Sequence, residues 1–220
     1  MIKQICIPLD SPNEWKDALK GIKHSFGQTW ENCYAMHLTT GLSTYLYCLE
    51  SDNGRIVCPI AEREYDGYID IVKPFGFSGF VGNGDCSEFP HYWKEFVRQK
   101  NYVCGYLGLD PLFDYSNNFL PDEIYQYNTV HVLDLTLSQD ELFANLSKGP
   151  KGRLRNWDQA KSLFVFDKAT LIDFFLDNYV DFFRRKNAPS FYFFSKSALA
   201  CPSPSFPKSF NLMFPAFMPI

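Results

Sequence analysis

The segment KPFGFSGFVGNGD, residues 73–85, interleaves glycines with phenylalanines between an expected strand and an expected helix. Glycine reaches positive φ without steric cost and lets a ligand or another backbone segment come close. Exposed amide groups at a helix N-terminus, together with the helix dipole, favour bound anions such as phosphate. The segment therefore suggests an anion site. The competing interpretation is a turn packed by aromatic side chains, which the loop taken alone favours.

A basic stretch forms a second candidate site. Its cations lie within residues 148–161, and they are Lys148, Lys151, Arg153, Arg155 and Lys161. Arginine and lysine make charge-assisted hydrogen bonds to phosphates. The stretch suits contacts with the phosphates of CoA, of tRNA or of a nucleotide-linked acceptor. The competing interpretation is a solvated helix face.

Aromatic and acidic residues near the glycine loop suggest an acceptor groove. The aromatic candidates are Tyr65, Tyr68, Phe75, Phe77 and Phe80, for which core packing is the competing role. The neighbouring carboxylates are Glu62, Glu64, Asp66 and Asp70. Transfer of an acyl group to an amine needs a base or a water relay to take the proton. Alternating surface acids on a hairpin are ordinary, however, and no Ser-His-Asp or Cys-His arrangement follows from spacing, so the catalytic residue stays unidentified.

Composition limits the classes of protein that fit. The chain has 220 residues, is 46% hydrophobic and 18% aromatic, and carries a formal charge of −4. A sizeable core is expected, and DNA binding is not. No apolar run reaches the ~20 residues that span a bilayer, and the polar N-terminus does not resemble a secretion signal, so we expect a cytoplasmic protein. The scattered cysteines and unpaired histidines favour reduced core thiols and no metal site.

Hydrophobic periodicity predicts an α+β chain in which strands alternate with helices. Strands are expected at 2–9, 43–51, 55–65, 68–74, 101–111, 129–136, 162–167 and 190–194. Helices are expected at 11–26, 85–100, 138–146 and 168–186, while 29–41 is ambiguous. Turn residues at 51–54 predict a hairpin. Capping boxes are expected at Ser11 with Glu14 and at Ser138 with Glu141, and Asp85 or Ser87 is expected to cap the helix after the glycine loop.

This layout, with a glycine loop between the fourth strand and the next helix, resembles the GNAT acyltransferases. In that family the loop carries the pattern Gln/Arg-x-x-Gly-x-Gly/Ala and holds the pyrophosphate of acyl-CoA. Gly82 and Gly84 match the pattern, and Gly79 stands where Gln or Arg is expected. The resemblance implies a GNAT-like mixed sheet flanked by helices and a donor site at these glycines.

The order of segments over residues 1–195 is also similar to the Fem family of peptidoglycan aminoacyltransferases, which resemble two GNAT-like halves in tandem. The matching positions are Asp134-Leu135, Glu141-Leu142, Ser147-Lys148, Arg153, Arg155-Asn156 and Ala160-Lys161. The resemblance implies an acyl-CoA or aminoacyl-tRNA co-substrate, with no permanently bound cofactor. It also implies a small-molecule, peptide or sugar amine as acceptor. The alternative is a binding module that holds an acceptor or partner and does no chemistry.

The same comparison implies a division of the chain into three parts. Residues 1–137 are expected to form the first GNAT-like domain, residues 138–195 a basic helical connection and the start of an incomplete second unit, and residues 196–220 an irregular tail. The tail holds five prolines, at 202, 204, 207, 215 and 219, and is either translated out of frame, which its composition favours, or a docking segment. Loss of the second half is expected to impair activity. Aromatic residues of 168–195 left uncovered are expected to favour self-association.

Overall fold

The computed structural model describes residues 2–74, 76–84, 86–126, 129, 132–155, 157 and 164–200. These residues fall into two units. The first holds residues 2–126 together with 193–200, and the second holds the described residues from 129 to 192. The expected boundary at 137/138 thus lies earlier in the chain, and the chain after 192 returns to the first unit.

The first unit is built on a mixed sheet of six strands in the order β1-β2-β3-β4-β6, with β5 beside β3. Its strands are β1 (Lys3–Pro8), β2 (Ser43–Ser51), β3 (Gly54–Tyr65), β4 (Tyr68–Val72), β5 (Val81–Gly84) and β6 (Tyr102–Tyr106). All neighbours are antiparallel except β4 and β6, which are parallel. The predicted α+β class, a mixed sheet flanked by helices, is therefore confirmed.

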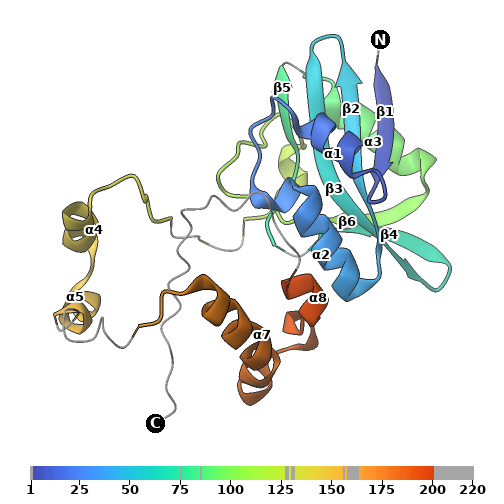
Figure 1. The fold of residues 1–220 in the computed structure, drawn as a ribbon. Helices are drawn as coiled ribbons and strands as arrows, with labels where there is room; N and C mark the ends of the chain where they lie inside the picture. Colours follow the sequence, from blue (N-terminus) through green and yellow to red (C-terminus); the bar gives the residue numbers. More distant parts are fainter. Residues whose placement is uncertain are drawn as a thin grey trace. The chain divides into compact units, whose positions relative to one another are not determined.

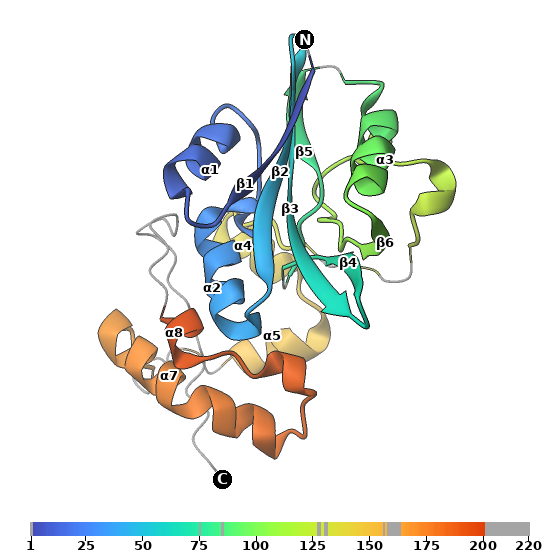
Figure 2. The same ribbon diagram turned by 90° about the vertical axis from the view of Figure 1, so that its right-hand side faces the viewer.

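Helices cover both faces of this sheet. Helices α1 (Pro12–Leu19) and α2 (Trp30–Thr40) lie on one face, and α3 (Phe89–Gln99) lies on the other (Figures 1 and 2). The core on the α1 and α2 side includes Ile7, Trp15, Leu19, Cys33, Leu46, Val57 and Val81. The core on the α3 side is aromatic and includes Tyr47, Ile60, Ile71, Phe80, Phe89, Phe96 and Tyr102. Apolar burial on both faces is the main stabilising contribution.

Alternation along β3 assigns its side chains to the two faces. Val57 packs on the α1 and α2 side, whereas Ile56 and Ile60 pack on the α3 side. Because successive side chains of a strand point to opposite faces, Arg63 and Tyr65 belong to the α1 and α2 side. The hairpin that follows turns at Asp66 and Gly67, both at positive φ, which suits a two-residue turn.

The glycine segment contains a strand that the sequence did not predict. Val81–Gly84 pairs antiparallel with Gly54–Val57 at the beginning of β3, while β4 pairs with residues 61–65 at its end. Both partners lie along the same edge of β3. The unit expected to be strand, loop and helix is therefore strand, loop, second strand and helix.

One predicted capping box and one predicted N-cap residue are wrong. Ser11 is the N-cap of α1, but its backbone, at φ −111° and ψ 61°, is not extended, and its hydroxyl makes no capping hydrogen bond. The expected box with Glu14 therefore does not form. The N-cap of α3 is Glu88 rather than Ser87, and Asp85 lies outside the described residues.

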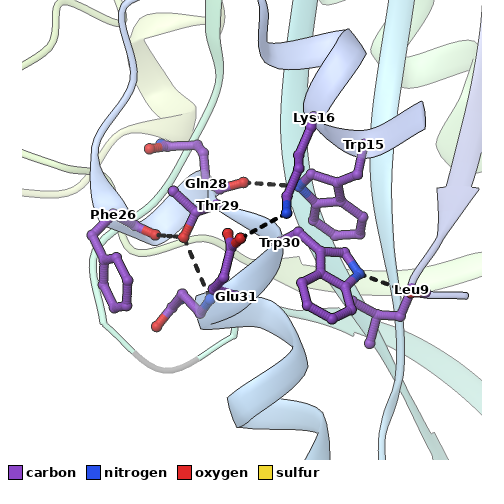
Figure 3. A network of polar contacts seen from close by, with 9 residues as sticks. Leu9, Trp15, Lys16, Phe26, Gln28, Thr29, Trp30 and Glu31 are labelled. Carbon is purple, nitrogen blue, oxygen red and sulfur yellow. Dashed lines mark hydrogen bonds and ion pairs between the residues drawn. The ribbon is translucent and has the colours of Figure 1, made fainter. Parts of the chain in front are cut away.

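A network of polar contacts fixes α1, α2 and the 3-10 turn Phe26–Gln28 relative to one another (Figure 3). The buried Trp15 indole donates to the Gln28 carbonyl at 3.0 Å, and the Trp30 indole donates to the Leu9 carbonyl at 2.8 Å. The buried Glu31 pairs with Lys16 at 2.9 Å. Because these groups are hydrogen-bonded, their burial costs little stability.

That turn also supports the glycine segment. The Gln28 amide donates to the Gly79 carbonyl at 3.4 Å. A Cβ on Gly27 would lie 1.9 Å from the carbonyl oxygen of Phe77, so Gly27 lets the two segments touch. The loop after β4 is thus held by contacts with a turn far away in the sequence.

The second unit consists of helices and turns in its described residues. They are α4 (Gln139–Asn145), α5 (Lys148–Leu154), α7 (Lys168–Arg185) and the 3-10 turn Ser190–Tyr192. The capping box of Ser138 and Glu141 forms as predicted. On α7, Tyr179 is buried and its hydroxyl donates to the Tyr192 carbonyl at 2.7 Å.

The strands predicted in the second unit do not appear among its described residues. Asp134 accepts hydrogen bonds from the Thr136 amide and hydroxyl, which bends the segment expected to be a strand at 129–136. Residues 164–167 are not a strand, and 162 and 163 lie outside the described residues. Residues 190–192 form a 3-10 turn instead of an extended chain. The described residues therefore give no sheet for a second GNAT-like unit.

Uncovered aromatic side chains were expected on residues 168–195, and two are plainly exposed. Phe174 and Phe182 of α7 are 53% and 44% exposed. The side chain of Phe191 lies outside the described part of the chain. The exposure is confirmed, and self-association stays a prediction.

The expected irregular tail begins with a helix. Helix α8 (Lys196–Leu199) is capped by the Ser195 hydroxyl, which accepts from the Ala198 amide. It packs against α2, and Ala198 is buried there. Residues 201–220 lie outside the described residues, including the five prolines and Cys201.

The different burial of the cysteines in the first unit predicts that their thiols differ in reactivity. Six described cysteines are free, and of these Cys33, Cys48 and Cys58 are buried while Cys104 is exposed. Burial raises the pKa of Cys48 to about 11 and raises the pKa of Cys33 and Cys58 well above the ordinary value. Since the thiolate is the reacting form, iodoacetamide at pH 8 should label Cys104 before the buried three, which should react only on unfolding. Peptide mass spectrometry would measure this, and early labelling of Cys58 would contradict it.

Candidate functional site

The described part of the first unit has a shallow pocket at the end of the β3–β4 hairpin. It has a volume of about 380 Å³ and is lined by Tyr65, Tyr68, Asp70 and Val103. We call these four residues the tyrosine groove. Its volume lies at the lower end of the range for small-molecule sites. Tyr65 is 81% exposed and Tyr68 is 62% exposed, so both rings are open to a ligand.

Strand pairing brings the groove together. Tyr65 lies opposite Tyr68, and Arg63 lies opposite Asp70, so their side chains share the α1 and α2 face of the sheet. Val103 comes from β6, whose parallel pairing with β4 shifts register between Ile69 and Ile71. The shift leaves an irregular ladder beside the groove.

The carboxylate of the groove is paired with a cation. Arg63 Nε and Nη2 donate to the two oxygens of Asp70 at 3.2 and 2.5 Å, and Cys104 Sγ donates to Asp70 Oδ2 at 3.8 Å. The hydrogen bonds from Arg63 hold the pKa of Asp70 below its ordinary value. A carboxylate of lowered pKa is a weak base, so Asp70 suits orienting a ligand better than removing its proton.

The other acidic candidates are dispersed. Glu62 lies on the α3 side of the sheet, where it accepts a hydrogen bond from the Tyr102 hydroxyl at 2.5 Å. Glu64 is exposed, and Asp66 occupies the hairpin turn. The four carboxylates that are close in sequence are therefore not a single cluster.

The aromatic candidates separate into groove, loop and core residues. Tyr65 and Tyr68 line the groove, Phe77 is half exposed in the loop after β4, and Phe80 is 1% exposed in the aromatic core. Phe75 lies outside the described residues. Val103 is the groove residue that the sequence did not reveal, because only its pairing with β4 brings it there.

The three candidate donor-site glycines lie along an extended segment rather than around one cradle. A Cβ on Gly79 would lie 2.9 Å from the Tyr115 ring, and one on Gly82 would lie 2.5 Å from the Arg55 carbonyl. One on Gly84 would lie 1.8 Å from the Asn53 carbonyl. Packing against the chain itself thus accounts for all three glycines. Gly82 and Gly84 remain exposed on β5, and their donor role stays a prediction.

The residue between those glycines has a structural role. The side-chain amide of Asn83 donates through Nδ2 to the Gly21 carbonyl at 3.4 Å. Arg55 Nη1 donates to the carbonyls of Asp17 and Ala18, each at 3.1 Å. Both side chains satisfy backbone oxygens at the end of α1, where positive charge is favoured. Arg55 also pairs with Glu50.

The basic candidates lie in the second unit. Lys151 on α5 donates to the Ala144 carbonyl at 2.8 Å, and its ammonium lies 5.8 Å from the Phe143 ring centre. Arg153 and Arg155 are exposed. The described contacts match a solvated helix end and do not test phosphate binding.

Among the residues with described structure, no three His, Cys, Asp or Glu side chains are grouped to hold a metal ion. Likewise, no helix in that part of the chain has both the length and the apolar character to cross a membrane. Comparisons with protein-family models, with curated proteins and with solved structures found no match.

Proposed function

We propose that residues 2–126 carry the acceptor site of an N-acyltransferase of the GNAT and Fem type, which acts on an amine of a cell-envelope precursor or sugar. The observation that carries the proposal is the tyrosine groove, an open aromatic site beside an irregular parallel strand pair. The order β1, α1, α2, β2, β3, β4, β5, α3, β6 supports it by resemblance to the GNAT layout, with β5 as a strand added within the glycine loop.

This reaction does not require a specialised catalytic side chain. The acceptor nitrogen attacks the carbonyl carbon of a thioester or aminoacyl ester, and the C–S or C–O bond breaks. The nitrogen loses a proton to water, and the departing sulfur or oxygen takes one up, which releases the CoA thiol or the tRNA hydroxyl. Holding the two reactants in line supplies the main rate enhancement. Tyr65 and Tyr68 would hold an acceptor ring or chain, and Asp70 with Arg63 would orient its polar groups.

The acyl-transfer proposal predicts a specific kinetic effect at Tyr68. With acetyl-CoA or charged tRNA as donor and amino sugars as acceptors, Tyr68→Ala should raise the KM for the acceptor about tenfold, or ~1.4 kcal/mol. The donor KM should not change. Tyr125→Ala is the control, since Tyr125 is an exposed tyrosine like Tyr68, at 81% against 62%, but does not line the groove. Absence of turnover with both donors, together with absence of acceptor binding, would count against the transferase.

A non-catalytic acceptor-binding module is the second candidate. The packing of Gly79, Gly82 and Gly84 against neighbouring parts of the chain favours it. These contacts explain why glycine is needed at each position without a bound acyl donor. Calorimetric titration of the unaltered chain separates the two candidates. Binding of CoA favours the transferase, whereas binding of amino sugars or peptides alone, lost in Tyr68→Ala, favours the module.

A further inference from the structure

Lys73 lies where the ladder between β4 and β6 is interrupted. The regular pairing ends at Val72 and Tyr106, and one further bridge joins Ser78 to Leu109. The Ser78 amide donates to the Gly108 carbonyl at 2.8 Å, which closes the far end of the interruption. Lys73 belongs to the segment between these two points.

The side chain of Lys73 bridges this gap. Its Nζ donates to the Gly76 carbonyl at 2.5 Å and lies 5.5 Å and 5.9 Å from the ring centres of Phe77 and Tyr106. A Cβ on Gly108 would lie 2.1 Å from Nζ, so the ammonium rests directly against the Gly108 backbone. Two aromatic rings and two chain segments thus surround a half-buried cation.

Among the described residues, no carboxylate pairs with the charge of Lys73. The ion pairs among the described residues do not include it, and burial alone lowers the pKa of its ammonium. An ammonium has three donors, and the carbonyl of Gly76 accounts for one. A partly buried charge is normally paired or hydrogen-bonded, so the remaining donors suit an anion from outside the chain.

We propose that Lys73 is the counter-ion for a small oxyanion, a carboxylate or a phosphate monoester, that binds where β4 and β6 separate. The rings of Phe77 and Tyr106 form the walls of this site, and the Lys73 ammonium binds the anion. The site does not depend on acyl transfer, so its test is independent of the proposed function.

The test is an NMR titration of the ¹⁵N-labelled full chain with inorganic phosphate or acetate, at constant ionic strength held with chloride. Saturable shifts should centre on the amides of residues 76, 77, 106 and 108. Saturation by phosphate alone assigns a phosphate monoester, and saturation by acetate alone assigns a carboxylate. In Lys73→Met the affinity should fall at least about tenfold, as expected for loss of a charge-assisted hydrogen bond.

Two controls keep the outcome decisive. Lys20→Met removes an exposed lysine that pairs with Asp17 on α1, and it should leave the titration unchanged. In the unaltered chain, a bound anion should raise the pKa of Lys73, followed by the ¹⁵Nζ shift, because an opposite charge favours the ammonium. Equal affinity in Lys73→Met, or no shift near residues 73–77 in the unaltered chain, would overturn the proposal.

Discussion

Replacing Phe80 by alanine is expected to lower the free energy of unfolding of the first unit by about 3–5 kcal/mol. Phe80 is 1% exposed, and its ring lies 4.7 Å from Phe89, 4.9 Å from Trp93 and 5.2 Å from Phe119, measured between centroids. Alanine would leave a cavity between the sheet and α3. Such a loss is a large fraction of the roughly 5–15 kcal/mol that stabilises a typical domain.

Phe77→Ala is the matched control in the same loop. Phe77 is half exposed, and its described ring contact is the Lys73 ammonium, so its loss should cost about 0.5–1 kcal/mol. Urea unfolding followed by tryptophan fluorescence measures both variants. A Trp157→Phe background restricts the signal to Trp15, Trp30 and Trp93, all of the first unit. Equal costs for the two variants would show that Phe80 is not a core residue.

The difference between these two phenylalanines marks a limit of sequence-based prediction. Both belong to one aromatic, glycine-rich loop, and the sequence offered both as groove residues. Their separation follows from contacts with distant segments: Phe80 precedes β5 and turns into the α3 side, while Phe77 rests beside Gly27 and Lys73. Local patterns do not encode such contacts.

The elements that were predicted correctly have local causes. The hairpin of β2 and β3 follows from Asp52 and Asn53 between two alternating apolar runs, and α4 follows from its capping box. β5 was missed because Val-Gly-Asn-Gly has little strand propensity. It is a strand because β3 extends beyond β4 and offers an unpaired edge.

The opposite error occurred at 129–136, where a segment of residues with high strand propensity was expected to be a strand. Strand propensity takes effect only when a partner strand is present, and the described residues of that segment have none. The residues of the tyrosine groove show the same contrast between local and distant contacts. Tyr65 and Tyr68 could be placed together from their hairpin, whereas Val103 arrives through a parallel crossover that includes α3.

Gly84→Ala is expected to destabilise the first unit far more than Gly67→Ala, although both glycines have φ of 77°. An L-residue in this left-handed region costs roughly 1–2 kcal/mol. Gly67 has open space around its Cβ position, so strain is its whole cost. At Gly84 the Cβ would lie 1.8 Å from the Asn53 carbonyl oxygen, and relieving that overlap adds about 1–3 kcal/mol by moving β5 away from β3.

The difference between the free energies of unfolding of the two variants measures the contribution of the close packing of β5 against β3. Urea unfolding in the Trp157→Phe background gives the free energies, and hydrogen exchange at Arg55 and Val57 reports whether β5 has detached from β3. We expect faster exchange at these amides in Gly84→Ala and unchanged exchange in Gly67→Ala. If Gly84→Ala were as stable as Gly67→Ala but lost affinity for CoA, the glycine would serve a ligand rather than strand packing. The donor-site hypothesis for the segment Gly79–Gly84 would then be supported.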